Sequence, residues 1–239
     1  MSYYSYDNRN GGGGLLSFLP PVTKNILVIN VFMLIFSMLR PEFMYSNFAL
    51  YYPTSPMFHW WQPITHMFMH GGFWHLFANM FTFIMFGATL ERQWGPRKYL
   101  LFYMVTGLGA AALHMGVMWC EVLHYQHLIA DGSADAAMAL REISLINRTP
   151  MVGASGAIYG VLMGFALLFP DTVITLLFPP IPLKAKWWIL IWLGIELFTG
   201  ITGAGGGIAH FAHLGGALFG WLLIRYWKRK GTMYNYYSE

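Results

Sequence analysis

Six apolar stretches divide this chain of 239 residues. Crossing a bilayer as a helix takes about 20 apolar residues, because each residue of helix adds only about 1.5 Å. The fifth stretch is the shortest and contains an acidic residue, Glu196. The stretches cover approximately Val22–Leu39, Gly72–Leu90, Tyr99–Trp119, Met151–Phe169, Trp187–Thr199 and Ile208–Trp227. We therefore predict an all-α membrane protein, a bundle of six transmembrane helices.

The composition excludes an ordinary water-soluble fold. Only 10% of the residues are charged, whereas soluble domains carry about a quarter. The 26 glycines and the 18% aromatic content suit helices packed closely in lipid. The single cysteine, Cys120, excludes an internal disulfide. We expect a flexible N-terminal tail over residues 1–21 without a cleavable signal peptide, one membrane domain over 22–228, and a short tail over 229–239.

Lysine and arginine residues are distributed unevenly between the two ends of these spans. The outer side would keep only Arg40, Arg141 and Arg148 if both termini were cytoplasmic. The inner side would then hold Arg9, Lys24, Arg92, Arg97, Lys98, Lys184, Lys186, Arg225, Lys228, Arg229 and Lys230. Because cytoplasmic loops of membrane proteins are enriched in Lys and Arg, we predict that both termini are cytoplasmic.

This orientation brings four polar side chains to one depth. The second, fourth and sixth spans enter from the outer face, and Ser155 and His213 lie four and five residues past two of these starts. At about 1.5 Å per residue, both lie roughly 6–8 Å below the start of their helix. His75 and Asn79 begin the second span, and their spacing places them on one helical face. We predict that the four residues converge near the outer surface.

Ser155 has two possible roles. A serine in a membrane helix usually bonds a backbone carbonyl or allows close packing, and Gly156, Gly160 and Gly164 form a packing ridge beside it. The small residues of GASG (153–156) also leave the hydroxyl approachable. The first backbone N–H groups of a helix have no partner within it and are free to donate. A structural role and a nucleophilic role both fit these residues.

His213 lies in the segment AHLGGALFG (212–220) of the sixth span. Ionisable residues at such depth in a membrane are candidates for function by default. Its neighbours Gly215, Gly216 and Gly220 would allow close contact with the glycine face of the fourth span. That contact would bring His213 within reach of Ser155, as a Ser–His pair requires.

Other ionisable residues leave a metal site as an alternative. His66 and His70 are spaced as i,i+4 and His210 and His213 as i,i+3, which is compatible with metal ligation. The sequence contains no HExxH motif, and no cysteine or carboxylate cluster accompanies these histidines. We expect no bound metal, and we interpret Glu91 and Glu196 as charges at helix ends or in the interface rather than as catalytic acids.

Three segments together resemble the rhomboid intramembrane serine proteases, over approximately Trp61 to Trp221. They are HGGFWHLFAN (70–79), GASG (153–156) and AHLGGALFG (212–220), in the family's order and on spans of the matching orientation. The second span also ends in the family-like segment GATLERQWG (87–95). Three motifs in the correct order are far more specific than GxSG alone.

The resemblance implies a set of roles. Ser155 would be the nucleophile and His213 its general base, as a catalytic dyad without an acidic third member. His75 and Asn79 would form the oxyanion hole together with the Ser155 amide, and Tyr159 would pack against the ring of the base. His70 would be a structural residue of the first loop. Where the family commonly has Trp-Arg in that loop, this chain has Trp61-Gln62, which puts the packing of the loop in doubt.

The resemblance also implies partners and a location. Substrates would be single-span membrane proteins cut near the outer end of their helix, without cofactors, nucleic acid or small-molecule partners. The glycine-rich segment Gly200–Gly207 would be a mobile cap over the site, and the second and fifth spans would form a lateral access route. We expect a multi-pass protein of the bacterial inner (plasma) membrane. Two alternatives stay open: an inactive rhomboid-like protein that binds transmembrane helices, and a metal carrier lined with histidines.

Overall fold

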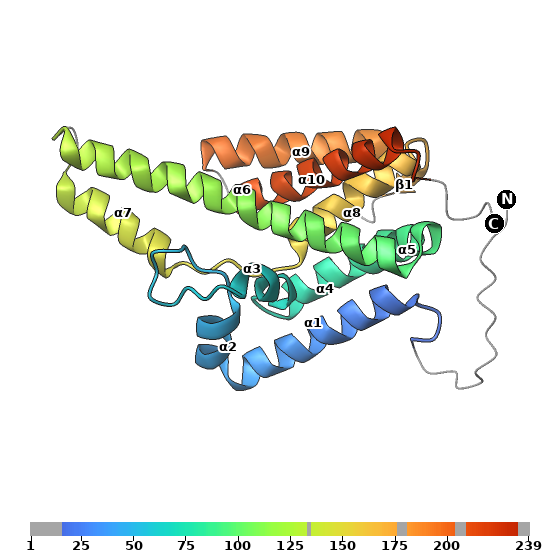
Figure 1. The fold of residues 1–239 in the computed structure, drawn as a ribbon, viewed down its shortest axis with the longest axis horizontal. Coiled ribbons are helices and arrows are strands. Elements are labelled where there is room, and N and C mark those ends of the chain that lie inside the picture. The colour runs from blue at the N-terminus through green and yellow to red at the C-terminus, as the bar shows by residue number, and fades with distance from the viewer. Residues whose placement is uncertain (1–15, 133–134, 176–180, 204–208, 234–239) are drawn as a thin grey trace.

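The computed structural model describes residues 16–132, 135–175, 181–203 and 209–233, and its long helices lie side by side along one axis (Figure 1). Within these ranges the only strands are β1 (Val173–Thr175) and β2 (Pro182–Lys184), which form a small antiparallel pair. The helices are α1 (Pro21–Leu39), α2 (Pro41–Phe48), α3 (Gln62–Thr65), η1 (His66–Phe68), α4 (Phe73–Thr82), η2 (Phe83–Gly87), α5 (Ala88–Trp94), α6 (Pro96–Ala130), α7 (Ala136–Arg148), α8 (Ser155–Leu168), α9 (Ala185–Thr202) and α10 (Ala209–Arg229). The start of α1 and the end of α10 lie at the same end of the bundle, on the right of Figure 1.

Four helices of the described chain are long and apolar enough to cross a membrane: α1, the continuous helix of residues 73–94, α6 and α9. Helix α8 is apolar but has only 14 residues. Large apolar side chains are exposed along α1, α4 and α9, where lipid would cover them; examples are Phe32, Phe36, Trp74, Phe77, Trp187 and Phe198. These surfaces suit a bilayer rather than water.

The helix boundaries differ from the predicted spans at several places, of which two are discussed here. The third predicted span ends at Trp119, whereas α6 continues to Ala130 and has 35 residues. The fourth was expected to begin at Met151, whereas α8 begins at Ser155. Gly153 has a φ of +135°, which an L side chain rarely adopts, so the chain cannot enter the helix before this point. Ser155 therefore lies in the first turn of its helix.

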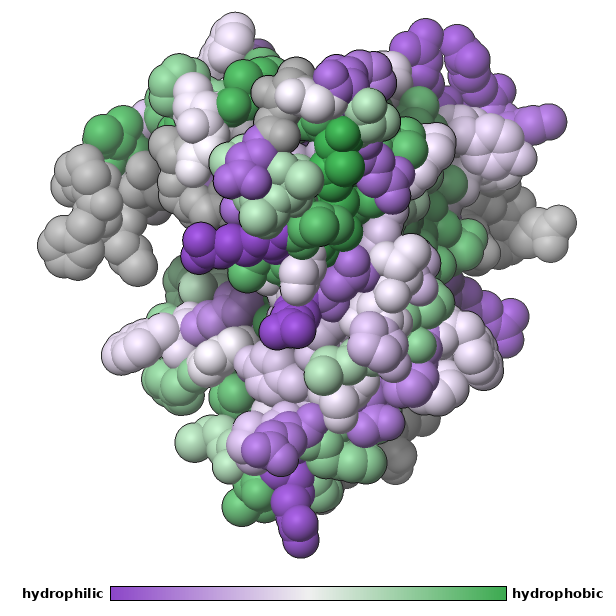
Figure 2. Space-filling view, turned by 90° about the vertical axis from the view of Figure 1, so that its left-hand side faces the viewer, coloured by the Kyte–Doolittle hydropathy of each residue, from purple (hydrophilic) through white to green (hydrophobic). Residues whose placement is uncertain are grey.

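The stretch from Cys120 to Pro150, between the third and fourth predicted spans, is largely helical rather than a loop. The end of α6 and the amphipathic helix α7 form a hairpin here, and Asp135 caps α7 by accepting the N–H of Ala137 at 2.9 Å. The end view in Figure 2 shows hydrophilic residues mixed with hydrophobic ones on the side where this hairpin lies. The inner face of the hairpin packs a small apolar cluster against the first loop, formed by Tyr52, Met118, Val122 and Ile146.

Glu91 lies at a helix end, as expected, and has a specific structural role there. Its buried carboxylate accepts hydrogen bonds from the backbone N–H groups of Val22 (2.8 Å) and Thr23 (2.7 Å) and from the Thr23 hydroxyl (2.7 Å). The first N–H groups of α1 have no partner within their own helix, so this side chain caps α1 from another helix. The contact fixes α1 against the end of α5.

Helix α10 packs against α6 and α8. The predicted contact between the two glycine faces is confirmed, because a β-carbon on Gly216 would lie 1.8 Å from the carbonyl oxygen of Gly156. One on Gly220 would lie 3.1 Å from the Gly160 backbone. The ridge of α8 also meets α6, since a β-carbon on Gly160 would overlap Thr106. The backbones of α8 and α10 therefore touch directly, as small residues permit in membrane helices.

Half of the predicted cap, residues 204–207, falls outside the described residues. Gly200 and Thr202 belong to the last turn of α9, and Gly203 follows with a φ of +70°. Residues 204–208 are not among those described.

Candidate active site

Ser155 and His213 meet where α8 and α10 cross. Nε2 of His213 lies 2.9 Å from Oγ of Ser155, which is hydrogen-bond distance. The two residues are 58 positions apart in the chain, and both are partly exposed. The geometry lets the imidazole accept the hydroxyl proton.

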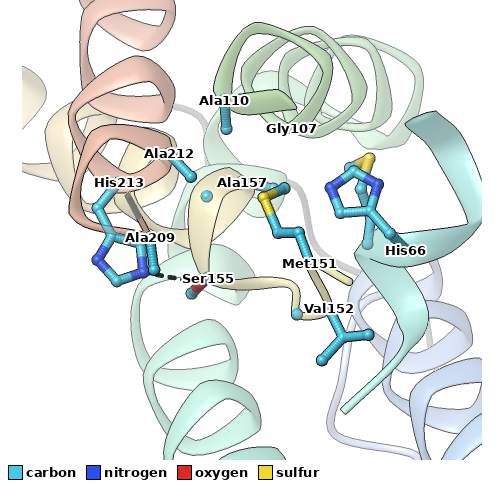
Figure 3. Close-up of a pocket in the computed structure, with 13 residues that line it drawn as sticks. His66, Gly107, Ala110, Met151, Val152, Ser155, Ala157, Ala209, Ala212 and His213 are labelled. Carbon is cyan, nitrogen blue, oxygen red and sulfur yellow. Dashed lines mark hydrogen bonds between the residues drawn. The ribbon is translucent and has the colours of Figure 1, made fainter. Parts of the chain in front are cut away.

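A small cavity of about 40 Å³ lies behind this pair (Figure 3). Its walls come from η1, α6, α8 and α10, with His66 and Met151 across the cavity from His213. The space exceeds the volume that one water molecule needs. Mainly apolar walls with a few polar groups can thus hold water next to Ser155.

His75 faces the same space as Ser155. A β-carbon on Gly153 would lie 3.2 Å from Nε2 of His75 and 3.6 Å from Oγ of Ser155, so both atoms border one point. The N–H of Gly71 donates to Nδ1 of His75 at 3.3 Å. This bond assigns the imidazole proton to Nε2, which makes Nε2 a donor on the side of Ser155.

Replacing Gly153 with alanine is expected to slow the reaction of Ser155 with a fluorophosphonate by about 10- to 100-fold. The methyl group would contact His75 at 3.2 Å, and the φ of +135° would be strained, so the loop before Ser155 must shift. The rate of covalent labelling of Ser155 measures the effect. Gly116→Ala is the control, because its β-carbon has nothing within 4 Å. Equal rates for the two variants would show that the space between His75 and Ser155 is not part of the reactive site.

Asn79 lies one turn after His75 on α4 and is buried. Its Nδ2 donates to the carbonyl of His75 at 2.8 Å. A carboxamide has two N–H donors, so this bond engages one of them. The same bond fixes the orientation of the amide relative to His75.

Tyr159 stacks on His213 with the rings nearly parallel, at 6°, and with 4.3 Å between their centroids. The phenol lies one turn after Ser155 on α8. Its hydroxyl accepts a hydrogen bond from the indole N–H of Trp192 on α9. The stack restricts rotation of the imidazole and leaves Nε2 directed at Ser155.

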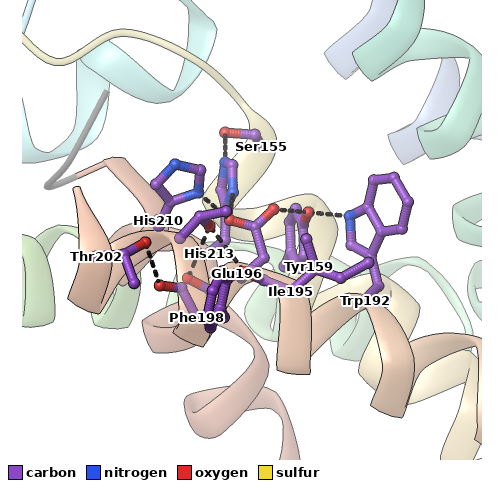
Figure 4. A network of polar contacts seen from close by, with 10 residues as sticks. Ser155, Tyr159, Trp192, Ile195, Glu196, Phe198, Thr202, His210 and His213 are labelled. Atoms are coloured by element: carbon purple, nitrogen blue, oxygen red, sulfur yellow. Dashed lines mark hydrogen bonds and ion pairs between the residues drawn. The ribbon is translucent and has the colours of Figure 1, made fainter. Parts of the chain in front are cut away.

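Glu196 was expected to be an interfacial charge, and this was wrong. It lies within α9, 7% exposed, and its carboxylate faces His210 and His213. The sequence showed no cysteine or carboxylate cluster beside these histidines, and the fold brings one carboxylate to two of them (Figure 4). Ligand atoms of Glu196, His210 and His213 lie within 4.8 Å of one another, whereas His66 and His70 are not part of this group. The signal available in the sequence was a single glutamate in an apolar run.

The first loop is held by Gln62 at the position where an arginine was expected from the resemblance. Its side chain is fully buried, accepts the N–H of Tyr51 (3.3 Å) and donates to the carbonyls of Ser46 (3.2 Å) and Met57 (2.7 Å). A neutral amide meets both needs without burying a charge. His70 is buried beside His75 with ring centroids 5.0 Å apart, consistent with a structural role in this loop.

Gln62→Leu is expected to lower the free energy of unfolding by about 2–4 kcal/mol, because one buried and two partly buried backbone groups lose this hydrogen-bond partner. Thermal unfolding in detergent measures this. Gln126→Leu, at an exposed position of α6, is the matched control. Equal melting temperatures for the two variants would show that Gln62 does not hold the loop.

The helices and this cluster define a helical membrane protein with a paired serine and histidine at a helix crossing. Residues 57–230 match the family model described as the Rhomboid domain. The chain belongs to the rhomboid family, and the predicted membership and the prediction of an all-α membrane protein are confirmed.

Similar proteins come from bacteria and from mitochondria. "RHOMBOID-like protein 12, mitochondrial" of Arabidopsis thaliana is 28% identical over 187 residues, which are 77% of this chain and 52% of that protein. "Rhomboid protease AarA" of Providencia stuartii is 28% identical over 166 residues, 69% of this chain and 54% of that protein. "Rhomboid protein 1, mitochondrial" of Saccharomyces cerevisiae is 28% identical over 167 residues, which are 66% of this chain and 40% of that protein. The chain spans about half the length of the relatives it matches.

Proposed function

We propose that this protein is an intramembrane serine endopeptidase. The observation that carries the proposal is the 2.9 Å contact between Oγ of Ser155 and Nε2 of His213. Ser155 attacks the scissile carbonyl carbon while its proton passes to Nε2, and His213 then gives that proton to the leaving amine. Water hydrolyses the acyl-enzyme in the second half of the reaction, and the cavity beside Ser155 is a place to hold it.

The negative charge that develops on the carbonyl oxygen, when Oγ adds to the carbonyl carbon, is stabilised by three donors in this proposal. They are the backbone N–H of Ser155, Nε2–H of His75 and the amide of Asn79. The first-turn N–H of α8 has no partner within its helix, and the Gly71 bond supports a proton on Nε2 of His75. Each donor of this kind contributes about 3–4 kcal/mol of transition-state stabilisation. Tyr159 holds the ring of the base through its stack.

The substrates are single-span membrane proteins cleaved near the outer end of the transmembrane helix. A helical peptide bond is shielded by its own hydrogen bonds, and opening it in lipid costs several kcal/mol for each unsatisfied group. A site close to the outer surface reduces this cost because water is near. The resemblance to rhomboid proteases implies small residues before the cut, and the glycine-lined surroundings of Ser155 are consistent with this. Substrate reaches Ser155 laterally between α4 and α9, whose outer faces carry exposed Trp74, Phe77 and Phe198.

The proposed topology has six spans, with both termini in the cytoplasm of a bacterial cell and the protein in its inner membrane. The excess of Lys and Arg on one side supports the orientation. The common position of the start of α1 and the end of α10 agrees with an even number of spans. Two of the relatives are named as mitochondrial. Cell fractionation tests in which membrane this protein lies.

Reaction with a fluorophosphonate tests whether the site is active. Folded protein in detergent is expected to be labelled once, at Ser155, and to cut single-span substrates at a position that mass spectrometry maps. Added EDTA is expected to change neither result, whereas a metal carrier would contain stoichiometric metal. Folded protein that is neither labelled nor able to cleave would overturn the proposal and favour an inactive helix-binding protein.

A further inference from the structure

Glu196 joins three polar residues behind the Ser155–His213 pair (Figure 4). Its Oε1 accepts the hydroxyl hydrogen of Tyr159. Its Oε2 lies 2.5 Å from Nδ1 of His210 and 3.1 Å from Nδ1 of His213. The side chain of Glu196 is 9% exposed, so these groups replace water around the carboxylate.

A carboxylate buried this far requires compensation by donors or positive charge. Three helices supply it: α8 contributes Tyr159, and α10 contributes His210 and His213, while Trp192 of α9 donates to the same phenol. No lysine or arginine within the described residues forms an ion pair with Glu196. The carboxylate is therefore committed to the two imidazoles and the phenol.

His213 is the one member of this group that also contacts Ser155. Its two ring nitrogens face different partners, with Nε2 toward the hydroxyl and Nδ1 toward Oε2 of Glu196. The Nδ1–Oε2 distance is that of an ion pair, although the alignment does not reach good hydrogen-bond geometry in this conformation. A carboxylate 3.1 Å from Nδ1 nevertheless favours a proton on that nitrogen electrostatically.

We propose that Glu196 is a positioning residue for His213, so that the site works as a triad of Ser155, His213 and Glu196 rather than as a dyad. The inference rests on the proposed protease function. Glu196 holds the proton of His213 on Nδ1, which leaves the lone pair of Nε2 free to accept the Ser155 proton. When that proton arrives, the ring is an imidazolium beside a carboxylate that stays ionised. Glu196 takes no proton, and the proton on Nε2 leaves with the amine.

The same atoms could instead bind a divalent cation, since a carboxylate and two imidazoles form a common ligand set. That arrangement conflicts with the proposed base. A metal on Nδ1 of His213 would force the remaining ring proton onto Nε2, and Nε2 could no longer accept the proton of Ser155. Metal binding would therefore inhibit cleavage, and chelation would increase it.

Glu196→Gln tests the triad, because the amide keeps the size of the side chain but loses its charge and can donate to Nδ1. We expect kcat to fall by about 100-fold or more, with KM within about threefold of wild type. The rate of fluorophosphonate labelling at Ser155 is expected to fall in parallel. Glu196→Asp, which keeps the charge on a shorter side chain, is expected to recover about tenfold or more of the lost rate.

His210→Asn is the matched control, because it removes the other imidazole on Oε2 and leaves His213 in place. We expect it to retain kcat within about fivefold if positioning of His213 is the role of Glu196. Melting temperatures of all variants are compared in detergent, and rates are normalised to folded protein. Should Glu196→Gln fail to fold, the kcat values of Glu196→Asp and His210→Asn are compared instead. A loss of kcat in Glu196→Asp alone supports the triad, and equal kcat values for the two variants overturn it.

The failures of the two proposals are distinguishable. If wild type cleaves, Ser155→Ala does not, and Glu196→Gln keeps the wild-type kcat, the triad is overturned and the protease stands. Stoichiometric zinc that both Glu196→Gln and His210→Asn lose, with activity raised by EDTA, would overturn the triad in favour of an inhibitory metal site. A folded wild type that neither cleaves nor labels would overturn both proposals.

Discussion

Ser155→Ala is expected to abolish cleavage, with kcat reduced by at least about 10⁴-fold, and to eliminate fluorophosphonate labelling. The reason is chemical: the alanine methyl group cannot form the acyl-enzyme, and the oxyanion donors alone provide only a small part of the rate. His213 would keep its stack on Tyr159. The variant therefore removes the nucleophile without rearranging the site.

The stability of this variant separates the two roles that a serine can have in a glycine-rich helix. Only the hydrogen bond to His213 is lost, which is worth about 1 kcal/mol, so the melting temperature should be nearly unchanged. Ser144→Ala on α7, at a similarly half-buried position, is the control for the substitution itself. Cleavage by Ser155→Ala at the wild-type rate would refute the nucleophile, and a large loss of stability would indicate a packing role.

The contact between α8 and α10 could be predicted because small residues at a spacing of four indicate that the backbones of two membrane helices lie close together. Each helix has a surface without side chains, which another backbone can approach closely. These surfaces are formed by Gly156 and Gly160 on α8 and by Gly216 and Gly220 on α10. The uneven distribution of Lys and Arg then gave the orientation of the spans, and this orientation placed the four polar residues at a similar depth in the membrane. These arguments need no knowledge of how the helices rotate about their axes.

Glu196 could not be assigned by the same reasoning because its partners depend on the rotation of α9. Its apolar neighbours give no clear face, since large side chains such as Leu190, Ile191 and Phe198 are exposed on a surface suited to lipid. A glutamate in such a run still requires a partner, which was a usable signal. The two histidines of α10 were the nearest candidates in the sequence.

The hairpin of α6 and α7 was missed for a different reason. Only apolar stretches were used to predict helices, although Asp135 followed by an alternation of apolar and polar residues is a signature of a capped amphipathic helix. The position of Gln62 was flagged correctly as unusual, but its three hydrogen bonds depend on backbone groups that only the folded loop brings together.

Gly216→Ala is expected to lower kcat by at least about 100-fold and to reduce the melting temperature. The added β-carbon would lie 1.8 Å from the carbonyl oxygen of Gly156, and a backbone atom cannot move aside as a flexible side chain can. The two helices must separate by more than an ångström. Cleavage kinetics and thermal unfolding measure the two effects, and Gly194→Ala on α9, whose β-carbon meets nothing within 4 Å, is the matched control.

The expected loss of activity follows from where Gly216 and Gly156 lie relative to the reacting atoms. Gly216 follows His213 by three residues on the same face of α10, and Gly156 is adjacent to Ser155. A separation that relieves the overlap also lengthens the 2.9 Å contact between Oγ and Nε2 beyond hydrogen-bond distance. The stack on Tyr159 could keep the imidazole near α8 only if the side chain of His213 left its preferred rotamer. If Gly216→Ala cleaves at the rate of Gly194→Ala, the distance between the two helix backbones does not set the geometry of the site.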